Sequence, residues 1–183
     1  MFLKAVFPGK YIQGEGVLSQ LPEWIKLLGK KGLVIASPTV KNKILPPYIS
    51  ALNKNSISIE LFQRECCEGE LNRISSIITG KGIDVIAGMG GGKAIDTAKI
   101  AADRHNIPVI IVPTIASTDA PCSGCAVLYS EKGHFQSVYY QKMNPQVVLV
   151  DMTVIASAPS RFLVAGMGDA LATWFEARSC ERT

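Results

Sequence analysis

The sequence lacks both a membrane-spanning apolar run and a recognisable export signal. The longest apolar run, around residues 109–112, stops at Pro113, far short of the ~18 residues that a membrane helix needs. Residues 1–4 show no basic region, long apolar stretch or small-residue cleavage site of a secretory signal. We therefore expect no membrane partner and a cytoplasmic location.

Cysteines are few, odd in number and unevenly spread, with 5 in the chain. Without an export signal, reduced thiols are the default. Cys122 and Cys125 have the spacing of a redox pair or of half a zinc ribbon, but Cys66 and Cys67 are adjacent and cannot supply the other half. The favoured interpretation is that Cys122 and Cys125 are small fillers beside a loop.

Charge is sparse and scattered. Charged residues make up 19% of the 183 positions against 48% hydrophobic ones, and the formal net charge is +4. No aromatic residues interleave with the basic ones in a stacking pattern, so a nucleic-acid partner is not expected. Length and composition indicate a globular chain with one domain and a fragment of a second.

Short apolar runs rich in Val and Ile alternate with helical patterns. Strands are predicted over residues 33–36, 57–62, 83–87, 109–112 and 147–150, and helices over 42–52, 70–79 and 93–104. This order predicts an α/β fold, with a doubly wound, mostly parallel sheet that helices cover on both faces. Residues 127–129 and 135–139 predict a β-hairpin inserted beside that sheet.

The final segment, residues 161–180, predicts a helix with one large apolar face. That face comprises Val164, Met167, Leu171, Trp174 and Phe175. The pattern ends at Thr183 without a glycine cap or a terminating proline. We expect a nucleotide-binding domain over residues 1–158, and over 159–183 the start of a second domain that is truncated here.

A glycine cluster links the strand at 83–87 to the following helix. It reads Gly88-Met-Gly90-Gly91-Gly92-Lys93, with Asp96 inside the helix. Glycines permit close backbone approach and positive φ, and a helix start presents free N–H groups at its positive dipole end. This combination predicts binding of a pyrophosphate; the alternative is a tight strand-to-helix turn without a ligand.

Neither of two familiar phosphate-binding motifs matches this cluster. A P-loop would need glycine at Ala87 and a hydroxyl at Ala94. A Gly-x-Gly-x-x-Gly fingerprint starting at Gly88 would need glycine at Lys93. The cluster predicts a dinucleotide or phosphate ligand without identifying which.

A second loop, residues 113–123, follows the next strand and is rich in hydroxyls. It carries Thr114, Ser117 and one carboxylate, Asp119, between Pro113 and Pro121, and Ser123 follows the second proline. Because parallel strands end at the same sheet edge, this loop is expected to face the glycine turn. Its hydroxyls could bind phosphate, ribose or the nicotinamide amide; the alternative is a surface loop held by local hydroxyl turns.

With both loops placed, the chain resembles the glycerol dehydrogenases of the iron/zinc-containing polyol dehydrogenase group, as their amino-terminal, nucleotide-binding half. The matching segments are residues 8–14, 90–99, 113–123 and 166–178. The glycine turn is shared with dehydroquinate synthases and other alcohol dehydrogenases, whereas the other two long segments are more specific. The resemblance implies a Rossmann-like domain, NAD as cofactor and glycerol as substrate, and leaves a homo-oligomer open.

The resemblance also implies roles for particular residues. The positions that match cofactor contacts are Gly90, Gly91, Gly92, Lys93 and Asp96 in the turn, Thr114 and Ser117 in the second loop, and Ser123, Cys125 and Tyr129 near the nicotinamide. Asp119 matches the residue that meets glycerol. Asp169 matches a zinc ligand, and the other two zinc ligands are histidines of an all-helical domain beyond this chain.

His105 and His134 match neither of those histidines, so the zinc site is incomplete in this chain. The implied reaction is oxidation of glycerol to dihydroxyacetone, with hydride passing to NAD and zinc acting as a Lewis acid. We expect the chain alone to be inactive. The alternative is a non-catalytic module of a shortened gene, which binds a dinucleotide or presents its terminal helix to a partner.

Ser37 is a further departure from the family pattern. It follows the strand at 33–36, where the family typically has an acid that holds the adenosine ribose. Such an acid accepts two hydroxyl hydrogen bonds and repels a 2′-phosphate. We therefore expect NAD with weaker discrimination against NADP, with Ser37 as a cofactor contact. Another alcohol or polyol also stays open as substrate.

Overall fold

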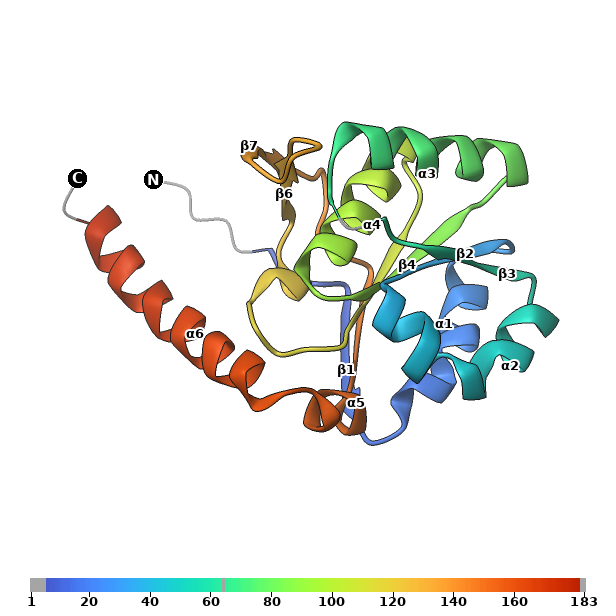
Figure 1. Ribbon diagram of the computed structural model, residues 1–183, viewed down its shortest axis with the longest axis horizontal. Helices are drawn as coiled ribbons and strands as arrows, with labels where there is room; N and C mark the ends of the chain where they lie inside the picture. The colour runs from blue at the N-terminus through green and yellow to red at the C-terminus, as the bar shows by residue number, and fades with distance from the viewer. Residues whose placement is uncertain (1–5, 64, 182–183) are drawn as a thin grey trace.

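A parallel sheet of six strands forms the centre of this computed structural model, which describes residues 6–63 and 65–181. The strand order is β1-β8-β5-β4-β2-β3 (Figure 1). The strands are β1 (Lys10–Gly14), β2 (Gly32–Ala36), β3 (Ile57–Leu61), β4 (Val85–Gly90), β5 (Val109–Pro113) and β8 (Val147–Asp151). The predicted doubly wound α/β fold is confirmed.

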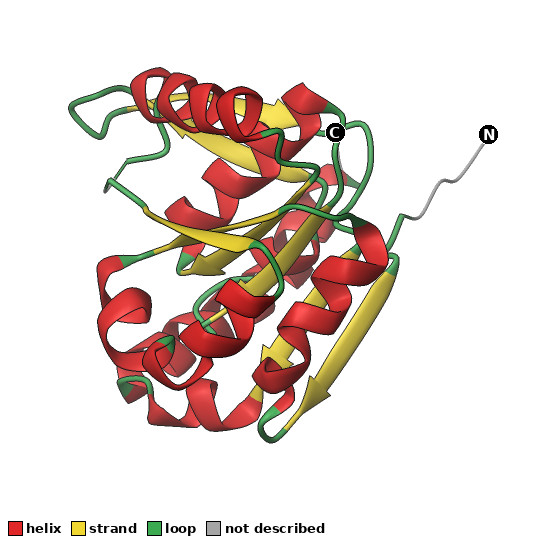
Figure 2. Ribbon diagram, turned by 90° about the vertical axis from the view of Figure 1, so that its right-hand side faces the viewer, coloured by secondary structure: helices red, strands yellow, loops and turns green. Residues whose placement is uncertain are grey.

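Helices cover both faces of the sheet (Figure 2). The helices of the described chain are α1 (Leu21–Leu28), α2 (Ile49–Lys54), α3 (Glu68–Lys81), α4 (Gly92–His105), α5 (Met152–Ser157) and α6 (Ser160–Cys180), of which α6 does not cover the sheet. Short turns of helix are η1 (Val17–Gln20), η2 (Val40–Ile44), η3 (Pro46–Tyr48) and η4 (Ala120–Cys122). None of the helices within residues 6–63 and 65–181 has both the length and the apolar character needed to cross a membrane.

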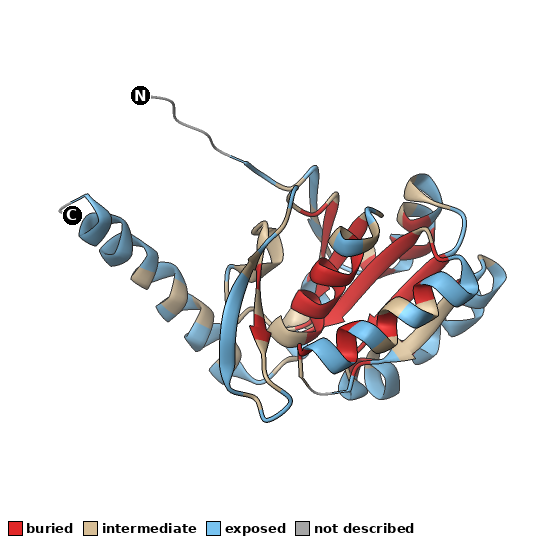
Figure 3. Ribbon diagram, turned by 90° about the horizontal axis from the view of Figure 1, so that it is seen from above, coloured by how far each residue is buried: buried red, intermediate tan, exposed pale blue. Residues whose placement is uncertain are grey.

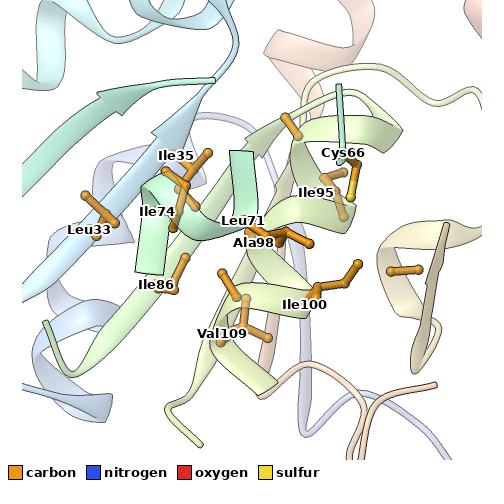
Figure 4. Packing of buried hydrophobic residues seen from close by; sticks show 14 of the residues in the cluster. Leu33, Ile35, Cys66, Leu71, Ile74, Ile86, Ile95, Ala98, Ile100 and Val109 are labelled. Carbon is orange, nitrogen blue, oxygen red and sulfur yellow. The ribbon is translucent and has the colours of Figure 1, made fainter. Parts of the chain in front are cut away.

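Successive side chains of each strand point to opposite faces of the sheet. In β2, Leu33 and Ile35 face a cluster with α3 and α4, whereas Val34 and Ala36 face a cluster with α1 and α2. Figure 4 shows the first cluster, with Ile95 of α4 near the sheet. Because β2 is buried along its whole length, its sequence is continuously apolar.

The predicted hairpin is also present as a separate antiparallel pair, β6 (Cys125–Tyr129) and β7 (Phe135–Tyr140). In contrast to the sheet, β7 is almost entirely exposed. The terminal helix α6 extends away from the sheet and is largely exposed (Figures 1 and 3). Its predicted apolar face, including Trp174 and Phe175, is therefore uncovered in this chain.

Several sequence-based boundaries were wrong. The helix expected over residues 42–52 is broken into η2, η3 and α2, since Pro46 and Pro47 lack amide donors. The strand expected over 83–87 begins at Val85 and continues through Gly90. The strand β1 was not predicted because, as a mostly exposed edge strand, it carries polar residues.

Candidate cofactor site

The glycine turn joins β4 directly to α4 at the carboxyl edge of the sheet. Gly90 has a φ of 158°, and a Cβ there would lie 3.0 Å from the Cβ of Ala94 and 3.3 Å from that of Ser37. Any side chain at Gly90 would therefore crowd both α4 and the end of β2.

At the start of α4 the backbone faces open space. Gly91 is the N-cap residue and offers no side-chain acceptor, and a Cβ on Gly92 would meet nothing within 4 Å. The helical geometry leaves the amides of Gly92 and Lys93 without an intrahelical acceptor. Two outward N–H groups at a positive helix end form a suitable cradle for an anion.

The hydroxyl-rich loop lies against this turn. The amide of Thr114 donates to the carbonyl oxygen of Gly90 at 3.1 Å, and a Cβ on Gly91 would lie 3.0 Å from Cδ1 of Ile115. Parallel pairing of β4 with β5 also sets Gly90 opposite Pro113. The expected juxtaposition of the two loops at one sheet edge is confirmed.

Lys93 reaches from the turn toward the hairpin. Its Nζ donates to Oε1 and Oε2 of Glu65 at 2.6 and 2.8 Å, and it lies 4.9 Å from the ring centroid of Tyr129. The two predicted cofactor residues Lys93 and Tyr129 are thus neighbours. A phosphate group at the turn would compete with Glu65 for this ammonium group.

Asp96 points into the protein rather than toward the open turn. Its side chain is buried, and Oδ2 accepts a hydrogen bond from the amide of Val127 at 3.0 Å. Its other oxygen, Oδ1, has no hydrogen-bond partner among the described residues. Burial raises the pKa of the Asp96 carboxyl, while the Val127 amide and Lys99 oppose that rise. In this geometry Asp96 anchors β6 to α4.

Lys99 is a polar residue whose role the sequence interpretation missed. Its side chain is 0% exposed, and its Nζ donates to the carbonyl oxygens of Ala120 and Cys125 and to Oγ of Ser123. Burial lowers the pKa of the Lys99 ammonium group. The available signal was a lysine three residues after Asp96, on the face of α4 that packs inward.

Asp119 and Asp169 meet although fifty positions separate them. The amide of Asp119 donates to Oδ2 of Asp169 at 3.0 Å. The helix α6 comes close at Gly166, where a Cβ would overlap the carbonyl oxygen of Ala116 and lie 3.3 Å from Cα of Ser117. The predicted substrate residue and the predicted metal residue therefore share one corner of the site.

A cavity of about 310 Å³ opens beside that corner, between the carboxyl ends of β1, β5 and β8 and the start of α6. Most of its lining is apolar, and its polar side chains include Tyr11, Gln13, Thr118 and Asp119. A mostly apolar cleft with a few convergent polar groups is typical of a small-molecule site.

The described residues do not by themselves form a zinc site. No group of three His, Cys, Asp or Glu side chains within residues 6–63 and 65–181 is placed to hold a metal. His105 contacts Ser75 and His134 is exposed in the hairpin, while Cys122 and Cys125 form no disulfide. Asp169 is thus a single candidate ligand, whereas a catalytic zinc needs three from the protein.

Ser37 borders the glycine turn from the neighbouring strand. Its amide donates to the carbonyl oxygen of Met89 at 3.2 Å, and its Oγ accepts from the amide of Val40 at 3.5 Å. The hydroxyl also lies 3.4 Å from where a Cβ of Gly90 would stand. A ligand held at the turn would therefore pass close to Ser37.

This arrangement of strand, glycine turn and helix matches a known family. The family model described as iron-containing alcohol dehydrogenase matches residues 8–152. The chain belongs to the iron-containing alcohol dehydrogenase family. The match covers the sheet, the glycine turn and the 113–123 loop, whereas Asp169 and the rest of α6 lie beyond it.

Proteins similar to this chain include several named glycerol dehydrogenase. The one from Thermotoga maritima is 45% identical over 183 residues, which is 100% of this chain and 50% of that protein. A crystal structure of a probable glycerol dehydrogenase from Sinorhizobium meliloti is 43% identical, with a TM-score of 0.88 over 97% of this chain and 49% of that one. The chain thus spans about half the length of these relatives.

A more distant solved structure supports the fold alone. The sulfoacetaldehyde reductase from Bifidobacterium kashiwanohense, solved in complex with NAD+, is 19% identical. Its TM-score is 0.80, covering 93% of this chain and 52% of that one. The same sheet and helices therefore persist at low sequence identity.

Proposed function

We propose that this chain binds a nicotinamide dinucleotide as the cofactor half of an NAD-linked, zinc-assisted glycerol dehydrogenase. The observation that carries the proposal is the open, uncapped start of α4 at Gly92, beside the loop that contains Thr114. An uncapped helix start next to hydroxyl groups suits a pyrophosphate and its ribose. The names of the relatives support glycerol as substrate.

In this proposal each loop binds a different part of the cofactor. The amides of Gly92 and Lys93 donate to the pyrophosphate, and Lys93 adds its positive charge. Thr114 and Ser117 hold the adjoining ribose. The positions proposed to face the nicotinamide end are Ser123, Cys125 and Tyr129. NAD, once bound, accepts a hydride from the alcohol carbon.

Asp119 is the proposed substrate contact. Its side chain is exposed at the rim of the 310 Å³ cavity, where it can accept a hydrogen bond from an alcohol hydroxyl. Oxidation of glycerol to dihydroxyacetone moves a hydride to NAD and releases the hydroxyl proton. Asp169 would supply one zinc ligand, and the described residues supply no complete set.

The exposed face of α6 supports a further domain. Leu171, Trp174 and Phe175 are each more than half exposed, at 63%, 53% and 59%. Such a large uncovered apolar face is typical of an interface. We propose that residues 159–183 begin the all-helical domain of the family, whose remainder would cover this face and complete the metal site.

Calorimetric titration of the 183-residue chain with NAD tests the cofactor assignment. We expect saturable binding of one equivalent below millimolar cofactor, because the pyrophosphate cradle lies within the described residues. Absence of binding at millimolar NAD would reject both the dehydrogenase half and a non-catalytic dinucleotide module. Binding without any effect of glycerol on the titration is compatible with the proposal, since the metal site is incomplete.

Ser37 is expected to permit NADP as well as NAD. Ser37 has no carboxylate to repel a 2′-phosphate, so the two affinities should agree within about 10-fold. Ser37→Asp should weaken NADP binding by about 100-fold while preserving or improving NAD binding. Ser37→Asn is the matched control, because it has the same shape without the charge. If Ser37→Asp and Ser37→Asn change the affinities for NAD and NADP equally, this role of Ser37 is contradicted.

A further inference from the structure

Lys99 is the largest fully buried side chain among the described residues. A buried ammonium group is costly unless all its donors are satisfied. Its three N–H groups have three acceptors, which are the carbonyl oxygens of Ala120 and Cys125 and the hydroxyl of Ser123. The distances to Ser123 and Cys125 are 3.2 and 3.1 Å. Every donor of Lys99 is therefore used within one short segment.

These bonds tie both ends of that segment to α4. Ala120 opens η4 directly after Asp119, and Cys125 opens β6. The hydroxyl of Ser123 accepts from Lys99, and its own proton has two acceptors within reach, the carbonyl oxygens of Ala120 at 3.1 Å and of Cys125 at 3.4 Å. Lys99 thus fixes the path of the chain from 120 to 125 and binds the Ser123 hydroxyl oxygen.

Asp96 supports this arrangement without using a donor of Lys99. It lies three residues earlier on α4, and its buried Oδ1 has no hydrogen-bond partner among the described residues. Its negative charge favours the charged form of Lys99, while its Oδ2 holds the amide of Val127 in β6. Lys99 and Asp96 together join the loop and the first strand of the hairpin to the helix that begins at the glycine turn.

We propose that Lys99 is a positioning residue for the nicotinamide end of the cofactor site. By fixing residues 120–125 to the middle of α4, it holds Ser123 and Cys125 in a fixed position relative to the pyrophosphate cradle at the start of the same helix. This inference rests on the proposed dinucleotide function. In this proposal Lys99 increases the affinity for the nicotinamide end of the cofactor without contacting the cofactor itself.

The test compares two ligands that differ only at that end. NAD and ADP-ribose share the adenosine and the pyrophosphate, but ADP-ribose lacks the nicotinamide. The unsubstituted chain should bind NAD more tightly than ADP-ribose. Lys99→Met, which fills similar volume without donors, should reduce NAD affinity by about 10-fold. It should leave ADP-ribose affinity within about 3-fold, because the glycine turn is unaffected.

A matched control comes from the same buried stretch of α4. Thr97 is also 0% exposed, but its hydroxyl donates to the carbonyl oxygen of Lys93 within the helix rather than to the loop. Thr97→Val should therefore change both affinities equally, even if it lowers stability. If Lys99→Met does not fold, Lys99→Gln replaces it, because the glutamine amide can still donate two hydrogen bonds. For Lys99→Gln we expect a smaller loss of NAD affinity, again without a matching loss of ADP-ribose affinity.

The outcomes separate this inference from the proposed function. If the unsubstituted chain binds neither ligand, the proposed function fails. If it binds both equally, or if Lys99→Met weakens both equally, the dinucleotide function stands and the positioning role is overturned. A selective loss of NAD in the Lys99 variant, absent in Thr97→Val, supports the role.

Discussion

Gly92→Glu is expected to remove NAD binding while leaving the fold intact. A Cβ at Gly92 meets nothing within 4 Å, and the position is the first of α4. An acidic residue in the first turn of a helix is favourable for the helix dipole, so stability should be unchanged or slightly raised. The new carboxylate would face the pyrophosphate, and two like charges ~4 Å apart repel by about 4 kcal/mol near a protein surface.

That repulsion corresponds to a loss of NAD affinity of roughly 100- to 1,000-fold. Calorimetric titration measures the affinity, and urea unfolding measures the stability. Gly92→Gln has a side chain of similar size without the charge, so it should lower the NAD affinity far less than Gly92→Glu does. Gly80→Glu controls for net charge, because Gly80 lies in α3 and its added Cβ also meets nothing within 4 Å. Unchanged NAD affinity in Gly92→Glu would show that the anion binds elsewhere.

The 183-residue chain is expected to oxidise glycerol at least about 10⁴-fold more slowly than a typical enzyme, whose kcat is about 10 s⁻¹. Asp169 is the proposed zinc ligand of this chain, the sequence contains only 2 histidines, and no group of three His, Cys, Asp or Glu side chains among the described residues could hold a metal. A catalytic zinc held by three protein ligands therefore cannot form from the described residues.

The measurement is NADH formation from glycerol and NAD, with and without added zinc. The full-length relative from Thermotoga maritima provides the positive control under the same conditions. Zinc should leave the rate of the 183-residue chain at the background level. Robust zinc-dependent turnover by this chain would contradict the incomplete metal site and the need for a further helical domain.

The sequence was sufficient to predict the sheet and the turn because both depend on local pattern. Continuous apolar runs such as β2 identify strands that are buried on both faces, and the cluster from Gly88 to Gly92 marks a strand that passes directly into a helix. The edge strand β1 could not be recognised from the sequence. Its exposed positions, which include Tyr11 and Gln13, interrupt any continuous run of apolar residues.

The partners of individual site residues come from distant parts of the chain, and the spacing of residues along the sequence does not reveal them. Asp96 was expected among the pyrophosphate contacts, yet its carboxylate is buried against Val127. Lys99 would ordinarily be placed on a surface, and only the folded chain brings it to Ser123. Likewise, the contact between Asp119 and Asp169 depends on the path of α6, which passes over the 113–123 loop.

The most direct measurement is an amide-resolved NMR titration of the chain with NAD. Should the cofactor's diphosphate rest at the start of α4, the amide resonances of Gly92 and Lys93 will shift most, accompanied by that of Thr114. Shifts confined to the opposite sheet edge, near Asn106 and Lys142, or an unperturbed glycine turn at saturating NAD would contradict the account.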